Sequence, residues 1–473
     1  MHIIIDPAYK PFERHIRYAV DVLLKDVLDI DSDIPVQIIY GNDLPYRESS
    51  VDRIIQIIPS NFFTKKTYLS PDSLPQSHIS FVETSEFMPL RVNFFEPKLP
   101  VLYWGLNKTE NVVLKKNNLI IVKADIIASA FFMLTRYEEM IVQKRDKYDR
   151  FPACESISFR EGFLHRPIIQ EYAELFWDWI KTLVPAASRR VKKFTLRLTH
   201  DIDKFKQYTS FAKEVVRIPW ALAFKGEKAS EAFQRFSEAL LVFSGKKKDP
   251  NITYERLMDI SEEHGARSCF YFMADNVKAA YKISDIEVIK TLEIILERGH
   301  EVGLHPNFGS YISYEKLARQ KDCLDRILGY ENYGARQHYL QWKLPETWRL
   351  YEKVGLAHDS SIGFLEMPGY KAGICVPYYV FDLEQGKQLS LIEIPLIVMD
   401  ASFYAKKYDV MRNKYFKTWL DSNMKEFDII DYVYYLKRQA KKYNGHFTAL
   451  WHNGRLNKSS ESDYINLISK DSD

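Results

Sequence analysis

From about residue 191 onward, short β-type segments alternate with segments of helical periodicity, and this pattern restricts the fold more than any other feature. Strands are expected at 194–200, 266–273, 300–305, 334–339, 357–360, 391–399 and 447–452. Helices are expected at about 285–298, 314–328, 345–354 and 421–443, and the polar insertion at 205–250 is expected to form helices on the rim. Alternation of this length predicts a parallel (β/α) barrel or a doubly wound sheet.

The first 190 residues read as a separate, smaller α/β domain. Strands are expected at 36–40, 54–58, 101–104 and 119–122, and helices at about 11–28, 125–140 and 167–183. The segment 126–134 is apolar nearly all round, which predicts a buried helix. It runs into a charged cluster at 135–139, predicted to be either a surface or a polar contact to the second domain. Residues 185–190 are a predicted linker, so the expected domains are 1–190 and 191–473. We expect a structural or substrate-guiding role for the first.

Composition excludes several classes of protein. The net charge of +3 is too small to indicate nucleic-acid binding. The four cysteines form no C-x-x-C pair, which argues against a zinc finger or a disulfide framework and favours reduced thiols. No apolar run approaches 18 residues and the first residues lack the pattern of a signal peptide. We therefore expect a cytoplasmic protein without a membrane span.

The first strand of the second domain ends in the sequence Thr-His-Asp-Ile-Asp, residues 199–203. Asp201 and Asp203 are two positions apart, so both project to the same side of an extended backbone. Like charges raise each other's pKa, which a bound cation or a division of labour relieves. A turn or a helix N-cap is the alternative at this point.

Several later strands in the second domain also end in residues that can bind a metal or transfer a proton. These residues are His305, Arg336 with His338, Asp359, and His452. A single histidine at a strand end is more often a hydrogen-bonded structural residue than a ligand. Acidic, imidazole and guanidinium groups at the ends of several parallel strands would instead meet at one edge, where active sites lie. This set suits metal-assisted hydrolysis, in which carboxylate and imidazole hold a divalent metal and a second carboxylate takes a proton from water.

These motifs, in this order, resemble the polysaccharide deacetylases of the NodB-homology type, carbohydrate esterase family 4, over residues 191–455. The family's T-F-D-D-G motif is similar to 199–203, its G-H-E-I-G-x-H segment to 299–305, and its R-x-P-[YW] motif to 336–339. The Y-D-S-S segment of one branch is similar to 358–361, and the closing strand with its histidine to 447–452. The segment 128–139 resembles a poorly characterised domain that precedes such deacetylases.

The resemblance implies a distorted (β/α) barrel and the roles of individual residues. Asp201 would be the general base, Arg336 its partner and His452 the catalytic acid. Asp203 and His305 would be metal ligands, with zinc as the expected metal and cobalt or nickel as alternatives. The substrate would be an acetylated carbohydrate, with predicted contacts from Tyr339, Asp359 and Trp451.

This sequence departs from the family pattern at two positions. The second histidine of the metal motif is replaced by Gly309, and the proline of R-x-P-[YW] is replaced by His338. Arg336 and His338 would share one side of a strand, so we expect His338 to replace the lost ligand. His200 is a weaker candidate because it should point away from Asp201 and Asp203.

Three functions fit these observations. The first is a metal-dependent hydrolase that removes acetyl groups, most simply N-acetyl, from a sugar or polysaccharide intermediate. The second is a degenerate deacetylase fold that serves as a non-catalytic glycan-binding or assembly module, as the lost ligand suggests. The third is a hydrolase of another C–N bond, such as a cyclic amide. Retention of both a base and an acid favours an enzyme over a binding module.

Overall fold

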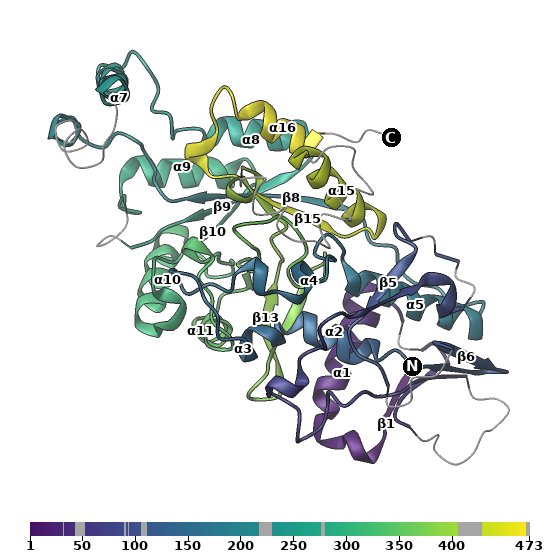
Figure 1. The fold of residues 1–473 in the computed structure, drawn as a ribbon. Coiled ribbons are helices and arrows are strands. Elements are labelled where there is room, and N and C mark those ends of the chain that lie inside the picture. Colours follow the sequence, from purple (N-terminus) through teal and green to yellow (C-terminus); the bar gives the residue numbers. More distant parts are fainter. Residues whose placement is uncertain are drawn as a thin grey trace. The chain divides into compact units, whose positions relative to one another are not determined.

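The computed structural model describes residues 1–31, 33–42, 53–88, 91–92, 94–105, 111–216, 229–275, 280–404 and 428–469. The chain forms two compact units (Figure 1). Unit 1 comprises Met1–Leu196, Phe308–Tyr314 and Asn332–Ala449. Unit 2 comprises Arg197–Asn307, Glu315–Glu331 and Leu450–Asp473. Each unit therefore joins segments that are far apart in the sequence, and the division of the sequence near residue 190 stays a prediction.

A five-stranded sheet forms the first layer of unit 1. Its order is β1 (His2–Ile5), β2 (Gln37–Tyr40), β3 (Ile54–Ile57), β7 (Leu119–Val122) and β6 (Val113–Lys116). The first four strands are parallel, and β6 is antiparallel at the edge. All four residues of β3 are buried, as its run of isoleucines requires in a parallel sheet. The strands predicted at 36–40, 54–58 and 119–122 are thereby confirmed. The fourth, expected at 101–104, lies earlier, at β5 (Lys98–Val101), which pairs with β4 (Ser80–Glu83).

The helices of this part of unit 1 are apolar where they meet. Helix α1 (Glu13–Asp21) continues as a π-helical turn at Val22–Val27 and packs against α2 (Ile126–Leu134). Every residue of α2 is buried, and α5 (Ile168–Leu183) packs against it and against β3. The predicted helix at 125–140 is wrong as a single helix. The chain leaves α2 at Thr135, passes through Arg136 in the left-handed region and starts α3 (Tyr137–Ile141).

The later segments of unit 1 form a second, three-stranded sheet. Its order is β11 (His358–Asp359), β13 (Lys387–Glu393) and β12 (Tyr378–Asp382), and helix α11 (Glu346–Val354) packs against β13. The expected strand at 391–399 is two strands, because β13 ends at Glu393 and β14 covers only Val398–Met399. Helix α15 (Ile429–Lys442) confirms part of the helix expected at 421–443, whose residues 421–427 lie outside the described part of the chain.

The strand expected at 334–339 is wrong. Ala335 forms an isolated bridge to Asp359, and a 3₁₀ turn follows at His338–Leu340. Tyr339 and Leu340 have φ of 61° and 52°, which no extended strand contains. Arg336 and His338 therefore do not alternate along a strand.

Three parallel strands form the sheet of unit 2, where β8 (Thr195–Ile202) pairs with β9 (Arg267–Phe272), and β9 with β10 (Glu301–Leu304). Strand β8 starts in unit 1 and continues into unit 2, as does β15 (His446–Leu450). Helix α8 (Tyr254–Glu263) packs against β9, and α9 (Ile286–Glu297) against β10. Figure 1 also shows α16 (Glu461–Ser469) beside α8.

This region also contains α7 (Ala229–Phe243), within the polar insertion, and α10 (Tyr314–Leu328), as expected from the sequence. The α/β class is confirmed by these parallel sheets, whereas a closed barrel stays a prediction. Among the described residues, every helix is too short or too polar to cross a bilayer.

Candidate active site

The last residues of β8 direct their side chains to alternate faces of the sheet, as the sequence predicts. His200 is fully buried, and its Nδ1 lies 2.8 Å from the Trp451 carbonyl while Nε2 lies 3.0 Å from Ser268 Oγ. Its ring also contacts Phe270, at 4.7 Å between centroids. Because both ring nitrogens have hydrogen-bond partners, His200 is placed as a structural residue. The side chain of Asp201 emerges on the opposite face.

His305 follows β10 and joins the two aspartates in unit 2. Its backbone N–H donates to the Phe272 carbonyl at 2.7 Å, which holds the residue at the end of the sheet. Its Nε2 lies 3.2 Å from Asp203 Oδ1, and its Nδ1 lies 3.8 Å from Asp201 Oδ2. Asp201 and His305 are almost completely buried, whereas the Asp203 side chain is 39% exposed. The imidazole thus lies between one buried and one accessible carboxylate.

His452 follows β15 and approaches the same carboxylate. Its Nε2 lies 3.8 Å from Asp203 Oδ2, and its side chain is 24% exposed. The next residue, Asn453, fixes this turn because its side-chain amide donates to the carbonyls of Lys204 and Asn251 at 3.0 and 2.9 Å. Unit 2 therefore brings together four predicted site residues: Asp201, Asp203, His305 and His452.

Trp451 lies on the other face of this segment. Its side chain is fully buried and packs on Tyr464 of α16 at 5.1 Å. This burial favours a packing role, and the predicted contact of Trp451 with a substrate stays a prediction.

Arg336 is fully buried in unit 1, where Ser360 orients it. Its Nε donates to the Ser360 carbonyl at 2.9 Å and one terminal nitrogen donates to Ser360 Oγ at 2.7 Å. Ser360 Oγ in turn donates to the Ile394 carbonyl at 2.9 Å. The two hydrogen bonds to Ser360 therefore fix the orientation of the guanidinium along one of its edges. Sequence analysis did not single out Ser360, although it belongs to the 358–361 motif.

Asp359 is buried in a hydrogen-bonded cluster of unit 1. It accepts hydrogen bonds from Trp348 Nε1 at 3.2 Å and from the Ser361 backbone at 2.9 Å. Its register partner on β13 is Glu393, which is also fully buried. Burial raises the pKa of Asp359, and burial together with the Asp359 charge raises the pKa of Glu393 well above its usual range. Glu393 was not predicted as a site residue, because an acid in an ordinary strand pattern carries no motif.

His338 and Tyr339 lie in the 3₁₀ turn of unit 1. His338 is half-buried and its ring lies 4.2 Å from that of Tyr339. Tyr339 is 45% exposed and stacks on Tyr148 at 4.8 Å, with the ring planes 11° apart. An exposed, stacked tyrosine is compatible with the predicted contact to substrate, which stays a prediction.

Comparison with known proteins adds little about these residues. Residues 8–185, less than half of the chain, match the model of a family of unknown function, DUF7033. The chain matches none of the curated proteins with which it was compared. Among solved structures it is similar to the "Crystal structure of putative polysaccharide deacetylase from Mycobacterium smegmatis", with 15% identity and a TM-score of 0.36, over 60% of this chain and 87% of that chain.

Proposed function

We propose that the protein is a metal-dependent hydrolase that removes acetyl groups, most simply N-acetyl groups, from a sugar or polysaccharide intermediate. The observation that carries this proposal is the cluster of Asp201, Asp203, His305 and His452 at the strand ends of unit 2. Each of these residues was expected there from a motif with an assigned chemical role. A purely structural cluster has no need of two carboxylates and two imidazoles at one sheet edge.

The donor set fits a divalent metal ion. Asp203, His305 and His338 offer one carboxylate and two imidazoles, the ligand types of catalytic zinc sites. Asp203 and His305 already meet in unit 2, and we propose His338 as the third ligand because the sequence loses one histidine at Gly309 and gains one here. Such a metal supplies Lewis acidity toward the acetyl carbonyl and makes water a stronger acid.

The residues of this chain have distinct roles in the proposed reaction. Asp201, held beside His305, takes the proton of the attacking water. Arg336 is its proposed partner. His452 gives a proton to the departing amine, and the carboxylate of Asp203 near its Nε2 stabilises the protonated ring. Tyr339 is proposed to contact the sugar, whereas the buried position of Asp359 favours a structural role.

The test is release of acetate from oligomers of N-acetylglucosamine by the full chain. We expect Asp201→Asn to lower the rate by about 10²–10⁴-fold, since it removes the general base and keeps the shape of the side chain. Asp259→Asn, on the outer helix α8, is the matched control and should change little. An unchanged rate in Asp201→Asn would refute the assignment of the base.

A specific observation keeps the non-catalytic module as a second candidate. Gly309, at the position of the lost ligand, has φ of 76° and ψ of 10°, a left-handed conformation that suits glycine. A histidine at this position would adopt that left-handed conformation only with strain. Glycan binding without any acetate release, and without retained metal, would favour this candidate.

A further inference from the structure

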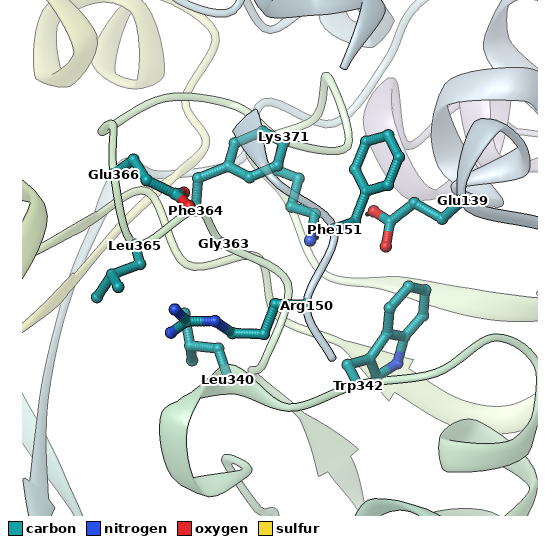
Figure 2. Close-up of a pocket in the computed structure, with 10 residues that line it drawn as sticks. All are labelled: Glu139, Arg150, Phe151, Leu340, Trp342, Gly363, Phe364, Leu365, Glu366 and Lys371. Atoms are coloured by element: carbon teal, nitrogen blue, oxygen red, sulfur yellow. Dashed lines mark ion pairs between the residues drawn. The ribbon is translucent and has the colours of Figure 1, made fainter. Parts of the chain in front are cut away.

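The hollow of unit 1 shown in Figure 2 is too small for a ligand. Glu139 and Lys371 form an ion pair there beside Trp342, with 3.3 Å between Lys371 Nζ and Glu139 Oε1 (Figure 2). Its free volume of about 10 Å³ is the space of about one water molecule. The hollow therefore has room for water only, in contrast to the exposed apolar side chains of α7 in unit 2.

Helix α7 leaves one apolar side open to solvent. Phe233, Leu240 and Phe243 have exposed fractions of 60%, 42% and 41%. Together with the half-buried Phe236 they recur at intervals of three and four residues, so all four lie along one side of the helix. Other elements normally cover such a side, because exposure of large apolar groups to water costs free energy.

A second helical segment extends this apolar side. Residues 211–216 are helical, and the Phe211 ring lies 6.0 Å from that of Phe236 and 5.9 Å from that of Phe243. Phe211 and Val215 are each 44% exposed and are one helical turn apart, so they share one side. The apolar surface, as the set is called below, consists of Phe211, Val215, Phe233, Phe236, Leu240 and Phe243. Exposed apolar surfaces of this kind mark sites of contact with a partner or a membrane.

Three exposed lysines, at 246–248, follow the C-terminal end of α7. The backbone N–H groups of the first two donate to the Leu241 carbonyl at 2.9 and 3.1 Å, which holds the run against the end of the helix. The side chains of the last two contact Glu238 and Glu255. Exposed ion pairs contribute little free energy, so the lysines can exchange these contacts for others.

Acidic side chains in the same segment are largely withdrawn from solvent. Glu214 and Asp249 are each 6% exposed, and Asp249 accepts from the Tyr208 backbone N–H at 2.9 Å. Glu238 accepts from the Tyr208 hydroxyl at 2.8 Å. The segment 204–249 has ten lysines and arginines against five acidic residues. The charge next to the apolar surface is therefore mainly cationic.

This combination of groups is complementary to an anionic lipid bilayer. Phenylalanine and leucine along one side of a helix, with lysines beside them, are typical of helices that lie in the interface of a membrane. The apolar side chains gain free energy by leaving water, and each lysine is attracted to anionic headgroups. An uncharged apolar partner would use the phenylalanines but would leave the lysines without a role.

We propose that the apolar surface binds the face of a bilayer that contains anionic lipids. The phenylalanine and leucine side chains enter the boundary between headgroups and acyl chains, and the lysines at 246–248 contact headgroup phosphates. Helix α7 has 15 residues, fewer than the roughly 20 that span a bilayer, so it lies along the membrane instead of crossing it. This inference goes beyond the proposed function, because lipid binding requires no catalysis.

The test is co-sedimentation of the full chain with vesicles of phosphatidylcholine, with and without phosphatidylglycerol. We expect the protein to bind the vesicles that contain phosphatidylglycerol, and to bind them less as the salt concentration rises. Acetate release is measured separately, so a failure of the proposed function leaves this test unaffected.

Two variants test the two parts of the surface. Phe233→Gln should weaken binding about tenfold, since it removes the most exposed phenylalanine of α7 and leaves the folded core intact. Replacement of all three lysines at 246–248 by glutamine should weaken it by about 10²-fold. Ile286→Gln is the control for the apolar change, because Ile286 is 65% exposed at the start of α9. Lys115→Gln with Lys116→Gln, on the exposed side of β6, is the control for charge.

Three outcomes would overturn the inference. The first is no binding to vesicles with phosphatidylglycerol, or binding of equal strength to vesicles without it. The second is equal binding by Phe233→Gln and the wild type. The third is a wild-type dimer that binds no vesicles and that Phe233→Gln dissociates, which would assign the apolar surface to a second copy of the chain.

Discussion

At the scale of single residues, His305 has a carboxylate near each ring nitrogen: Asp203 at 3.2 Å and Asp201 at 3.8 Å. Carboxylate and imidazole groups that lie this close together are the ligand types that a divalent cation binds. The geometry of unit 2 therefore supports the ligand roles proposed for Asp203 and His305 independently of the motif.

Glu393 gives a prediction about pH. Its folded-state pKa is raised, so its contribution to stability is fully present below the unfolded pKa near 4.5 and is lost as pH rises toward the folded value. The stability of the wild type should fall by up to about 1.4 kcal/mol per pH unit in that window. Glu393→Gln resembles the protonated acid and can donate to Asp359, so it should be more stable than the wild type at pH 8 and nearly equal at pH 4.5. Urea unfolding at the two pH values measures this.

The control for this prediction is Glu83→Gln, because Glu83 is half-exposed on β4 and pairs with Lys98. The substitution should change the free energy of unfolding only slightly at both pH values. A Glu393→Gln variant that is less stable than the wild type at pH 8 would show that the ionised carboxylate is the form that unit 1 requires.

At the scale of elements, Asp125 determines where α2 begins. Its Oδ1 accepts from the Ala128 backbone at 3.0 Å, as an N-cap does. Its Oδ2 accepts from the Ser60 backbone and hydroxyl, both at 2.7 Å, and from the Tyr40 hydroxyl at 2.8 Å. One buried carboxylate thus joins the start of α2 to the ends of β2 and β3.

Removal of this cap should be costly. Asp125→Ala loses the cap and leaves buried donors without an acceptor, so we expect a loss of about 3–5 kcal/mol in the free energy of unfolding. Asp428→Ala is the matched control, because Asp428 caps α15 from an exposed position through Ile430 and should cost about 0.5–2 kcal/mol. Urea unfolding followed by circular dichroism measures both. Equal losses would show that the contacts of Asp125 with Ser60 and Tyr40 contribute nothing.

The sequence predicted elements best where periodicity was strong and local. The expected strands near β3, β7, β8 and β9 and the helices α5, α9 and α10 are confirmed within a few residues. It failed at 334–339, where a 3₁₀ turn with positive φ at Tyr339 replaces the end of the expected strand, and at Arg136, which breaks a helix. The bonds of Arg136 to Glu138 and to the Lys371 carbonyl explain that break, and a contact across 235 positions leaves no periodic signal.

The residues of the candidate site also differ in whether the sequence could predict them. Asp201, Asp203, His305 and His452 were predicted because each ends a strand with a recognisable motif, and unit 2 brings them together. Glu393 was missed, because its properties depend on neighbours supplied by distant segments. A buried acid pair becomes visible only after the chain has folded.

At the scale of the whole molecule, the third metal ligand is proposed from the sequence. Relative to the family pattern, one histidine is lost at Gly309 and one is gained at His338.

Metal content tests that proposal. We expect about one equivalent of zinc, cobalt or nickel in the purified wild type and a loss of at least tenfold in metal affinity in His338→Ala. His264→Ala is the control, because its imidazole bonds to the Ile260 carbonyl and to Ser469 on the outer helices. Metal retained by His338→Ala would move the third ligand elsewhere. Absence of metal in every variant after reconstitution would favour the non-catalytic module.

Unit 2 is formed by segments that are far apart in the sequence, and this has a consequence for biosynthesis. Its strands β8, β9 and β10 emerge from the ribosome long before Leu450–Asp473, yet the Thr199 carbonyl and His200 Nδ1 find their partners in Trp451. During translation the nascent chain must keep this edge of β8 unpaired while more than a hundred residues of unit 1 are made. An unpaired edge strand is prone to aggregation. Chaperone engagement of ribosome-bound chains should therefore persist until Leu450–Asp473 has left the exit tunnel.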